Sequence, residues 1–212
     1  MTRLALVIDL RRCVGCHTCA NACKMSNDVP MGMLWNRVLT ENCDVIDGAE
    51  GTYPNLKRTY LPIACQHCDN AACQRVCPVG ATYKDDKGRI EVDYDKCIGC
   101  RMCMAACPYN VRSFNFGGNE TYFPELGEGT PYEEARGGEF VVGTVTKCNF
   151  CADRVDADNP LPACAQTCPT HARIFGDMET DEMKNLVASG AYELQPEKGT
   201  KPQVYYLPLK RD

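Results

Sequence analysis

The spacing of cysteines constrains this chain more than any other feature. Sixteen of its 17 cysteines fall into four motifs of four, in a sequence of 212 residues. The motifs comprise Cys13, Cys16, Cys19 and Cys23; Cys65, Cys68, Cys73 and Cys77; Cys97, Cys100, Cys103 and Cys107; and Cys148, Cys151, Cys164 and Cys168. Each motif begins with a C-x2-C pair and ends with a C-x3-C pair. A cysteine content this high is typical of folds held together by disulfides or metals rather than by a large apolar core.

Disulfides and zinc each explain only part of this pattern. The number of cysteines is odd, no secretory signal is predicted, and the members of a C-x2-C pair lie too close together for easy pairing. Structural zinc sites use two C-x2-C pairs separated by a long spacer. Only the fourth motif, Cys148 to Cys168, has that form.

The first and third motifs have the spacing C-x2-C-x2-C-x3-C, which indicates iron and sulfide instead. In bacterial ferredoxins with two clusters, this run is followed by proline, and its fourth cysteine binds the other cluster. Proline follows the last cysteine of three motifs, at Pro78, Pro108 and Pro169, whereas Lys24 follows the first. The spacing therefore predicts four [4Fe–4S] clusters, and an apo-chain that folds poorly without them.

The predicted fold class is α+β, with two interlocked bacterial-ferredoxin-like units that each hold two [4Fe–4S] clusters. Strands are predicted at residues 4–8, 82–84, 89–92, 141–146 and 172–175, with one helical turn behind each third cysteine. Only 19 residues separate the second and third motifs, so these two form one compact unit. The first and fourth motifs must then come together from the two ends of the chain.

The predicted domain boundaries follow from this pairing. The first unit comprises residues 1–23 and 140–178, and the second comprises residues 65–107. Residues 24–64 are predicted to form a β-hairpin insertion, residues 108–139 a Gly/Glu-rich insertion loop, and residues 179–212 a short helix with an extended tail. Long insertions on a compact core usually carry function, here the docking of a partner, although an ordinary surface excursion is the alternative.

Charge and hydropathy disfavour a nucleic-acid partner and insertion into a membrane. The formal net charge is −5, whereas phosphate binding requires a basic surface. The apolar runs at 4–8 and 140–142 are too short for a signal core or a membrane span, and Arg11-Arg12 lacks the apolar segment of a twin-arginine signal. We expect a soluble chain without its own signal. It is either cytoplasmic or exported with a partner that carries a twin-arginine signal, and attached peripherally at the membrane.

Residues beside the motifs are predicted to tune the clusters rather than bind them. His17, His67 and His171 are candidates for hydrogen bonds to a cluster, because the thiolates already complete its ligation. Arg101 and Lys147 also stand beside cluster cysteines, where tuning of the potential and a solvated surface position fit equally well.

The remaining candidates have simpler interpretations. Cys43 lies outside every motif and is predicted to be a small buried apolar residue rather than a redox group. Trp35 and Tyr60 are predicted to be core or interface residues. The sequence contains no nucleophile–base pair, phosphate-binding loop or flavin motif, so no catalytic residue is predicted.

With all four motifs placed, the chain resembles the four-cluster electron-transfer (beta) subunits of the molybdopterin oxidoreductase family. These accompany the catalytic subunits of dimethyl-sulfoxide, polysulfide, thiosulfate, arsenate and nitrate reductases and of formate dehydrogenases. The resemblance rests on the order and spacing of the motifs from Cys13 to Cys168, on Cys-Gln-His-Cys at 65–68 and on Cys-Ile-Gly-Cys-Arg-Met-Cys at 97–103. Some relatives lack one cysteine of the third motif, but all four are present here, so no [3Fe–4S] cluster is expected.

The resemblance implies which cysteines share each cluster. The sets are Cys13, Cys16, Cys19 and Cys168 (cluster 1); Cys23, Cys148, Cys151 and Cys164 (cluster 2); Cys65, Cys68, Cys73 and Cys107 (cluster 3); and Cys77, Cys97, Cys100 and Cys103 (cluster 4). Cluster 1 would lie nearest the partner, a large molybdopterin catalytic subunit. A quinol-oxidising membrane anchor is a common further partner in this family.

Two other functions stay open at this stage. A free-standing polyferredoxin would shuttle electrons between enzymes by diffusion, but it would need little more than its cluster cores. A self-contained enzyme would need a cluster with an open iron, whereas every motif here supplies four cysteines. The substrate of the catalytic partner and the direction of electron flow are not encoded in this chain.

Overall fold

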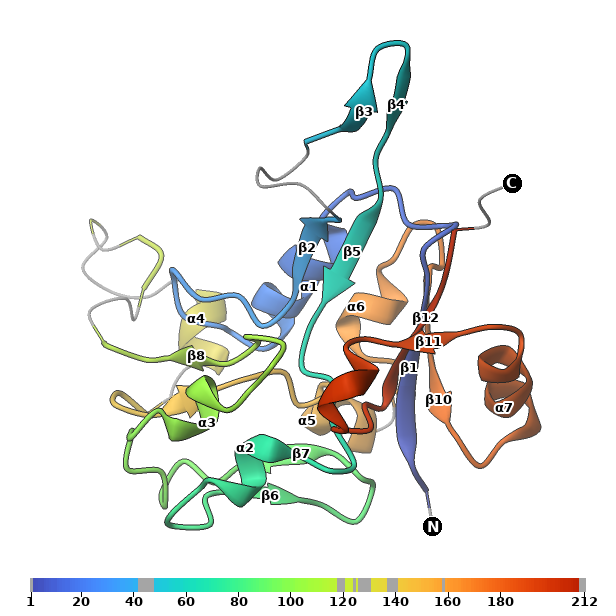
Figure 1. Cartoon of the computed structure of the whole chain (residues 1–212). Coiled ribbons are helices and arrows are strands. Elements are labelled where there is room, and N and C mark those ends of the chain that lie inside the picture. Colours follow the sequence, from blue (N-terminus) through green and yellow to red (C-terminus); the bar gives the residue numbers. More distant parts are fainter. Residues whose placement is uncertain are drawn as a thin grey trace.

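Figure 1 shows the computed structural model of the chain, which describes residues 2–41, 48–117, 121–123, 125, 131–136, 141–157 and 159–209. Cys43 and much of the predicted loop at 108–139 lie outside the described residues. Short helices and short strands alternate along the chain, so the fold is α+β as predicted.

The elements are short and numerous. The strands are β1 (Leu4–Asp9), β2 (Arg37–Thr40), β3 (Glu50–Thr52), β4 (Asn55–Lys57), β5 (Tyr60–Ile63), β6 (Thr82–Lys84), β7 (Ile90–Val92), β8 (Ser113–Phe114), β9 (Val145–Thr146), β10 (Arg173–Asp177), β11 (Tyr192–Glu193) and β12 (Val204–Leu207). The helices are α1 (Thr18–Ser26), α2 (Ala72–Arg75), α3 (Met102–Ala105), α4 (Pro131–Arg136), α5 (Ala152–Asp156), α6 (Ala163–Gln166), α7 (Asp181–Ala188) and the 3₁₀ turn η2 (Pro196–Lys198). Across the described residues, none of these helices has the length and apolar character needed to cross a bilayer.

A four-stranded sheet, in the order β10-β1-β12-β11, joins the two ends of the chain. β1 pairs antiparallel with β10 and parallel with β12, with Leu6 opposite both Phe175 and Val204. All six residues of β1 are buried, as expected for an apolar strand with neighbours on both sides. The sequence predicted β1 and β10 closely, but it described the tail only as extended and did not anticipate the pairing of β12 with β1.

The remaining strands form two-stranded ladders. β6 and β7 form the predicted hairpin, whose turn is held by the Asp85 carboxylate as it accepts hydrogen bonds from the backbone N–H groups of Lys87 and Arg89. β2 pairs with β5, and β3 pairs with β4 beyond them, so residues 37–41 and 48–63 extend as an arm from the body of the molecule (Figure 1).

The predicted strand at 141–146 is wrong over its first half. Only Val145 and Thr146 are paired, as β9 against β8. Gly143 has a φ of +84°, a conformation that turns the chain and that a β-strand cannot continue through. The apolar character of residues 141–142 therefore reflects a turn at the surface, where both valines are exposed.

The predicted helical turns are present, but each begins one residue before the third cysteine of its motif rather than behind it. Each third cysteine lies in a short helix, at Cys19 in α1, Cys73 in α2, Cys103 in α3 and Cys164 in α6. α7 begins after Thr180, whose hydroxyl accepts a hydrogen bond from Met183 N at 3.4 Å, and it ends two residues before Gly190. This is the short helix predicted within residues 179–212.

Candidate metal centres

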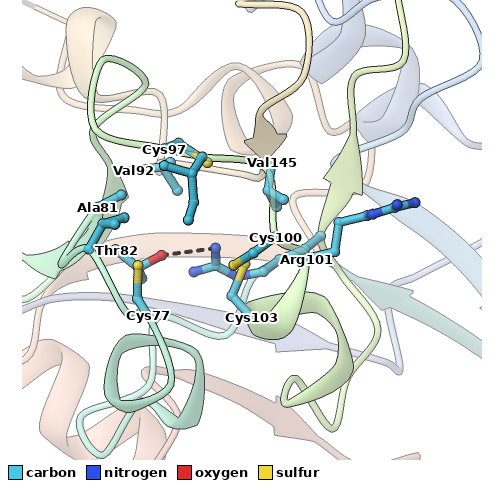
Figure 2. Close-up of a pocket in the computed structure, with 12 residues that line it drawn as sticks. Cys77, Ala81, Thr82, Val92, Cys97, Cys100, Arg101, Cys103 and Val145 are labelled. Carbon is cyan, nitrogen blue, oxygen red and sulfur yellow. Dashed lines mark hydrogen bonds between the residues drawn. The ribbon is translucent and has the colours of Figure 1, made fainter.

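Three cavities in the structure are each lined by four cysteines. We call them site 1 (Cys13, Cys16, Cys19, Cys168), site 2 (Cys23, Cys148, Cys151, Cys164) and site 4 (Cys77, Cys97, Cys100, Cys103), the last of which is drawn in Figure 2. The same set of four thiols in each cavity indicates the same kind of occupant in all three. Each group matches one of the four sets that the resemblance implied.

The remaining four motif cysteines also lie together, and we call them site 3 (Cys65, Cys68, Cys73, Cys107). Burial, together with the neighbouring thiols of Cys65, Cys73 and Cys107, raises the pKa of Cys68 to about 12. All sixteen motif cysteines are thus grouped in fours by the fold.

The arrangement of the thiols fits a cluster better than a single ion. Four thiolates on one zinc ion would lie within about 4 Å of each other, because each Zn–S bond is only about 2.3 Å long. In the described part of the chain, no three His, Cys, Asp or Glu side chains converge in a way that could hold one ion. The sixteen described cysteines are also free of disulfides.

Glycines shape the loops of the first and third motifs in the same way. Gly15 and Gly99 have φ values of +68° and +67°, and the next residues but one, His17 and Arg101, are also left-handed. A Cβ at Gly15 would overlap the ring of Tyr60, and a Cβ at Gly99 would overlap the carbonyl oxygen of Gly143. Glycine therefore favours the tight turn that directs the cysteines on either side into one cavity.

Comparison with known proteins identifies the occupant. A family model described as "4Fe-4S dicluster domain" matches residues 56–122 and 118–178, and one described as "4Fe-4S binding domain" matches residues 11–26.

A protein of Halobacterium salinarum, whose name describes the iron–sulfur subunit of a dimethyl sulfoxide reductase, is 49% identical over 98% of this chain and 79% of its own length. The arsenate respiratory reductase iron–sulfur subunit of Shewanella sp. is 37% identical over 97% of this chain and 96% of its own. The thiosulfate reductase electron transfer subunit of Salmonella typhi is 37% identical over 84% of this chain and 78% of its own.

This chain belongs to the iron–sulfur (beta) subunits of the molybdopterin oxidoreductase family. The resemblance seen in the sequence is thereby confirmed, and so is the prediction that the chain binds [4Fe–4S] clusters.

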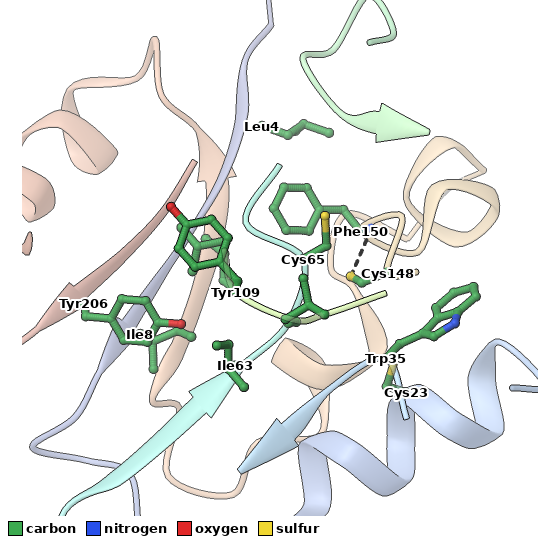
Figure 3. Packing of buried hydrophobic residues seen from close by; sticks show 14 of the residues in the cluster. Leu4, Ile8, Cys23, Trp35, Ile63, Cys65, Tyr109, Cys148, Phe150 and Tyr206 are labelled. Carbon is green, nitrogen blue, oxygen red and sulfur yellow. Dashed lines mark hydrogen bonds between the residues drawn. The ribbon is translucent and has the colours of Figure 1, made fainter. Parts of the chain in front are cut away.

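Members of this family must hold thiolates, and the thiols here differ in how readily they ionise. Burial raises the pKa of Cys23 and Cys148 well above the ordinary value, and that of Cys164 to about 11. Both Cys23 and Cys148 lie within the main apolar core together with Cys65 (Figure 3). These thiols must lose a proton when they bind iron, so assembly of the buried clusters releases protons.

Cys77 and Cys168, each followed by proline, behave in the opposite way. Burial acts to raise the pKa of each thiol, but hydrogen bonds lower it overall. At Cys77 they come from the backbone N–H groups that follow, and at Cys168 from the Thr170 side chain and then from the backbone N–H groups that follow. Ala172 N, for example, lies 3.3 Å from the Sγ of Cys168. These hydrogen bonds therefore favour the thiolate form of the cysteine at both Cys-Pro turns.

The histidines have different positions. His171 is exposed and His17 is half-buried, whereas His67 is fully buried and its ring stacks on Phe150 at 3.7 Å. Burial, together with Lys147, lowers the pKa of His67 well below the ordinary value, and its Nδ1 accepts a hydrogen bond from Ile90 N. His67 is thus a neutral core residue packed between motifs.

Arg101 and Lys147, the two cations noted beside cluster cysteines, differ in their exposure to solvent. Arg101 is exposed and stacks on Phe114 at 4.8 Å, as a surface residue would. Lys147 is buried, so the solvated interpretation is wrong for it. Trp35 is a core residue, as predicted, and its Nε1 donates to Thr146 at 3.0 Å.

Sequence analysis missed two buried arginines, Arg112 and Arg173. Each stands five residues after the last cysteine of a motif, in Cys107-Pro108-x3-Arg112 and Cys168-Pro169-x3-Arg173. The shared Cys-Pro-x3-Arg spacing was the signal that could have identified them.

Proposed function

We propose that this chain relays electrons through four [4Fe–4S] clusters, to or from a molybdopterin-containing catalytic subunit. The observation that carries the proposal is the continuity of the four sites. Cys19 of site 1 lies within electrostatic range of Cys164 of site 2, Cys148 of site 2 lies near Cys65 of site 3, and Cys73 of site 3 lies near Cys103 of site 4. The four sites therefore follow one another in a single line, which suits a relay.

In this proposal each site holds the cluster of the same number, through the four cysteines that define it. The clusters supply one-electron redox chemistry when bound. The chain supplies the thiolates, excludes water from Cys65 and Cys148 at the centre of the line, and spaces neighbouring sites.

The same grouping supports two interlocked ferredoxin-like units. Sites 1 and 2 draw on α1 near the N-terminus and on α5 and α6 from the fourth motif, and α1 packs against α6 (Figure 1). The cysteines of sites 3 and 4 all lie between Cys65 and Cys107. We accordingly propose the boundaries 1–23 with 140–178 for one unit and 65–107 for the other, with the arm and the loop at 108–139 as insertions.

The two ends of the line reach the surface. Cys16 of site 1 and Cys100 of site 4 are exposed, and so are Val14 and Ile98 beside them. We propose that site 1 faces the molybdopterin subunit and that site 4 faces the other redox partner, such as a quinol-oxidising membrane anchor. The chain would join this complex as a peripheral subunit, in the cytoplasm or after export with the catalytic partner.

The deciding experiment is the metal content of the natural complex, purified without oxygen. We expect about 16 iron atoms per copy of this chain, since each [4Fe–4S] cluster holds four, and about one molybdenum or tungsten atom. About 16 iron atoms without either metal would favour the free polyferredoxin. Much less iron, with zinc in its place, would contradict both functions.

Ligand assignment is tested by a pair of variants. Cys168→Ser should perturb the electron paramagnetic resonance (EPR) signal of the cluster bound by Cys13, whereas Cys164→Ser should perturb that of the cluster bound by Cys23. The two cysteines lie on the same motif, four residues apart. If both variants perturb the same signal, the cross-ligation between the ends of the chain is wrong.

A further inference from the structure

Four lysine or arginine side chains are buried in the described part of the chain: Arg89, Arg112, Lys147 and Arg173. Arg89 forms ion pairs with Asp85 and Asp156. The other three, which are only 5%, 2% and 5% exposed, form no ion pair with a carboxylate of the described residues. A buried charge without a counter-ion is costly, so each of the three requires an anion beside it.

Arg173 lies between sites 1 and 2. Its side chain lines the cavities of both sites, and its Nη1 donates to the Sγ of Cys164 at 3.6 Å. Its Nη2 donates to the Oδ1 of Asn36 at 2.8 Å, and Asn36 in turn donates to the backbone carbonyl of Cys19. The guanidinium is thus fixed by one cysteine of site 2 and, through Asn36, by the backbone of site 1.

Arg112 occupies the corresponding position between sites 3 and 4. It lines the cavity of site 4 and lies close to the thiols of Cys73 in site 3 and Cys103 in site 4. Its Nη1 donates to the Oγ1 of Thr82 at 3.3 Å, the bond drawn as a dashed line in Figure 2. Its buried Nη2 has no hydrogen-bond partner among the described residues, so one N–H donor is available to a group in the cavity.

Lys147 lies between sites 2 and 3. Its Nζ donates to the backbone carbonyl oxygen of Cys148, a site 2 residue, at 2.8 Å. It also donates to the backbone carbonyl oxygen of Ile90. Its charge also acts on Cys65 of site 3. Every junction in the line of four sites therefore contains one buried cation that forms no salt bridge with a described carboxylate, although the carboxylate of Glu91 lies within electrostatic range of Lys147.

We propose that Arg173, Lys147 and Arg112, the junction cations, set the reduction potentials of the clusters in overlapping pairs. The inference rests on the proposed function, since it takes each site to hold a cluster. A [4Fe–4S] cluster with four thiolates is an anion in both of its working states, so it is the counter-ion that Arg112 and Arg173 lack and a second anion for Lys147, beside the carboxylate of Glu91. A cation between two clusters favours the more negative, reduced state of both, and raises both potentials.

A junction cation acts alike on the two clusters that exchange an electron. Each transfer moves one electron from a reduced cluster to its oxidised neighbour, and no bond or proton changes. Because the junction cation is close to both clusters, it stabilises the electron on either side. It therefore raises the affinity for the electron without favouring one site strongly over the next.

The test is a redox titration of the complete complex, followed by EPR, with Arg112→Gln. We expect reduction of clusters 3 and 4 to become at least tenfold less favourable, which lowers each one-electron potential by about 59 mV or more, while clusters 1 and 2 are unchanged. Arg173→Gln should lower the potentials of clusters 1 and 2 only, and Lys147→Met should lower the potentials of clusters 2 and 3 only. Arg112→Lys keeps the charge and should keep the potentials near their native values.

Arg101→Gln is the matched control. Arg101 lines the same cavity as Arg112, but it is exposed, so water screens its charge. All four potentials should stay close to their native values in this variant.

Unchanged potentials in an Arg112→Gln complex with its full iron content would overturn the inference, and so would an equal shift of all four. If Arg112→Gln loses iron, Arg173→Gln and Lys147→Met test the same rule, and unchanged potentials in either overturn it. Failure of the proposed function is recognised separately, because the native complex would then lack about 16 iron atoms or its molybdenum.

Discussion

Gly99→Ala should remove the cluster of site 4 without changing any cysteine, whereas Gly15→Ala should leave the cluster of site 1 in place. The two glycines occupy the same position in the C-x2-C pairs of the third and first motifs, and their φ values are +67° and +68°. The backbone strain on an alanine is therefore equal at both. They differ in what the new methyl group meets, which is backbone at Gly99 and a side chain at Gly15.

The structure gives the size of this difference. A non-glycine residue in the left-handed region costs about 1–2 kcal/mol at either position. At Gly99 the methyl group would also overlap the carbonyl oxygen of Gly143, whose backbone N–H is held by Asn115 O at 2.8 Å. Displacing packed backbone adds about 1–3 kcal/mol, for a total of about 2–5 kcal/mol. At Gly15 the half-buried ring of Tyr60 can rotate away, so the cost stays near the strain alone.

The assay is iron content per chain together with the EPR signal of each cluster. Gly99→Ala should lower the iron from about 16 to about 12 atoms and remove the site 4 signal, while Gly15→Ala should retain about 16. Gly143→Ala is the control for strain alone, since its φ is +84° but a Cβ there would meet no atom within 4 Å. If Gly15→Ala and Gly143→Ala lose as much iron as Gly99→Ala, strain rather than overlap decides, and the reasoning is refuted.

Two further predictions concern stability, each measured by anaerobic urea unfolding. Asp156→Asn should lower the free energy of unfolding by about 1 kcal/mol at pH 7, a value discounted for solvent screening because the Asp156 side chain is 37% exposed. Hydrogen bonds, first from Arg89, lower the pKa of Asp156 from 3.8 to about 2. The carboxylate therefore stabilises the fold fully above pH 4, and the difference from the native chain should shrink as the pH falls from 4 towards 2; a difference independent of pH would contradict this. Thr180→Ala should cost about 1 kcal/mol through loss of the α7 cap, Thr180→Ser should restore most of it, and an unchanged Thr180→Ala midpoint would contradict the capping role.

The local structure around the cysteines was predictable because it depends on residues close together in the chain. The cysteine spacing, with x3 spanning one helical turn, led to the right helices in the first and third motifs. The β6–β7 turn and the Thr180 cap were predictable for the same reason, since each is held by hydrogen bonds between residues no more than four apart. The assignment of individual cysteines to clusters stays a prediction, although the fold groups the thiols in the same fours.

Features that depend on distant residues were missed or misjudged. The strand expected at 141–146 was shortened by the turn at Gly143, which apolar character alone could not reveal. The interpretation of Lys147 was left open because burial is a property of the packed molecule. Arg112 and Arg173 were missed because their exposure is decided by what surrounds them and not by their neighbours in sequence.

The spacing of sixteen cysteines is enough to specify the chemistry of this protein, because the geometry of a cluster loop is local and few metal groups match it. The order of the four sites, and the cations between them, come from folding alone. β1 must pair with β10 and β12 before the first and last motifs meet, and that pairing joins residues more than 160 positions apart. Apolar burial drives this long-range closure, and by removing water from the junctions it makes single charges such as Arg173 strong enough to matter.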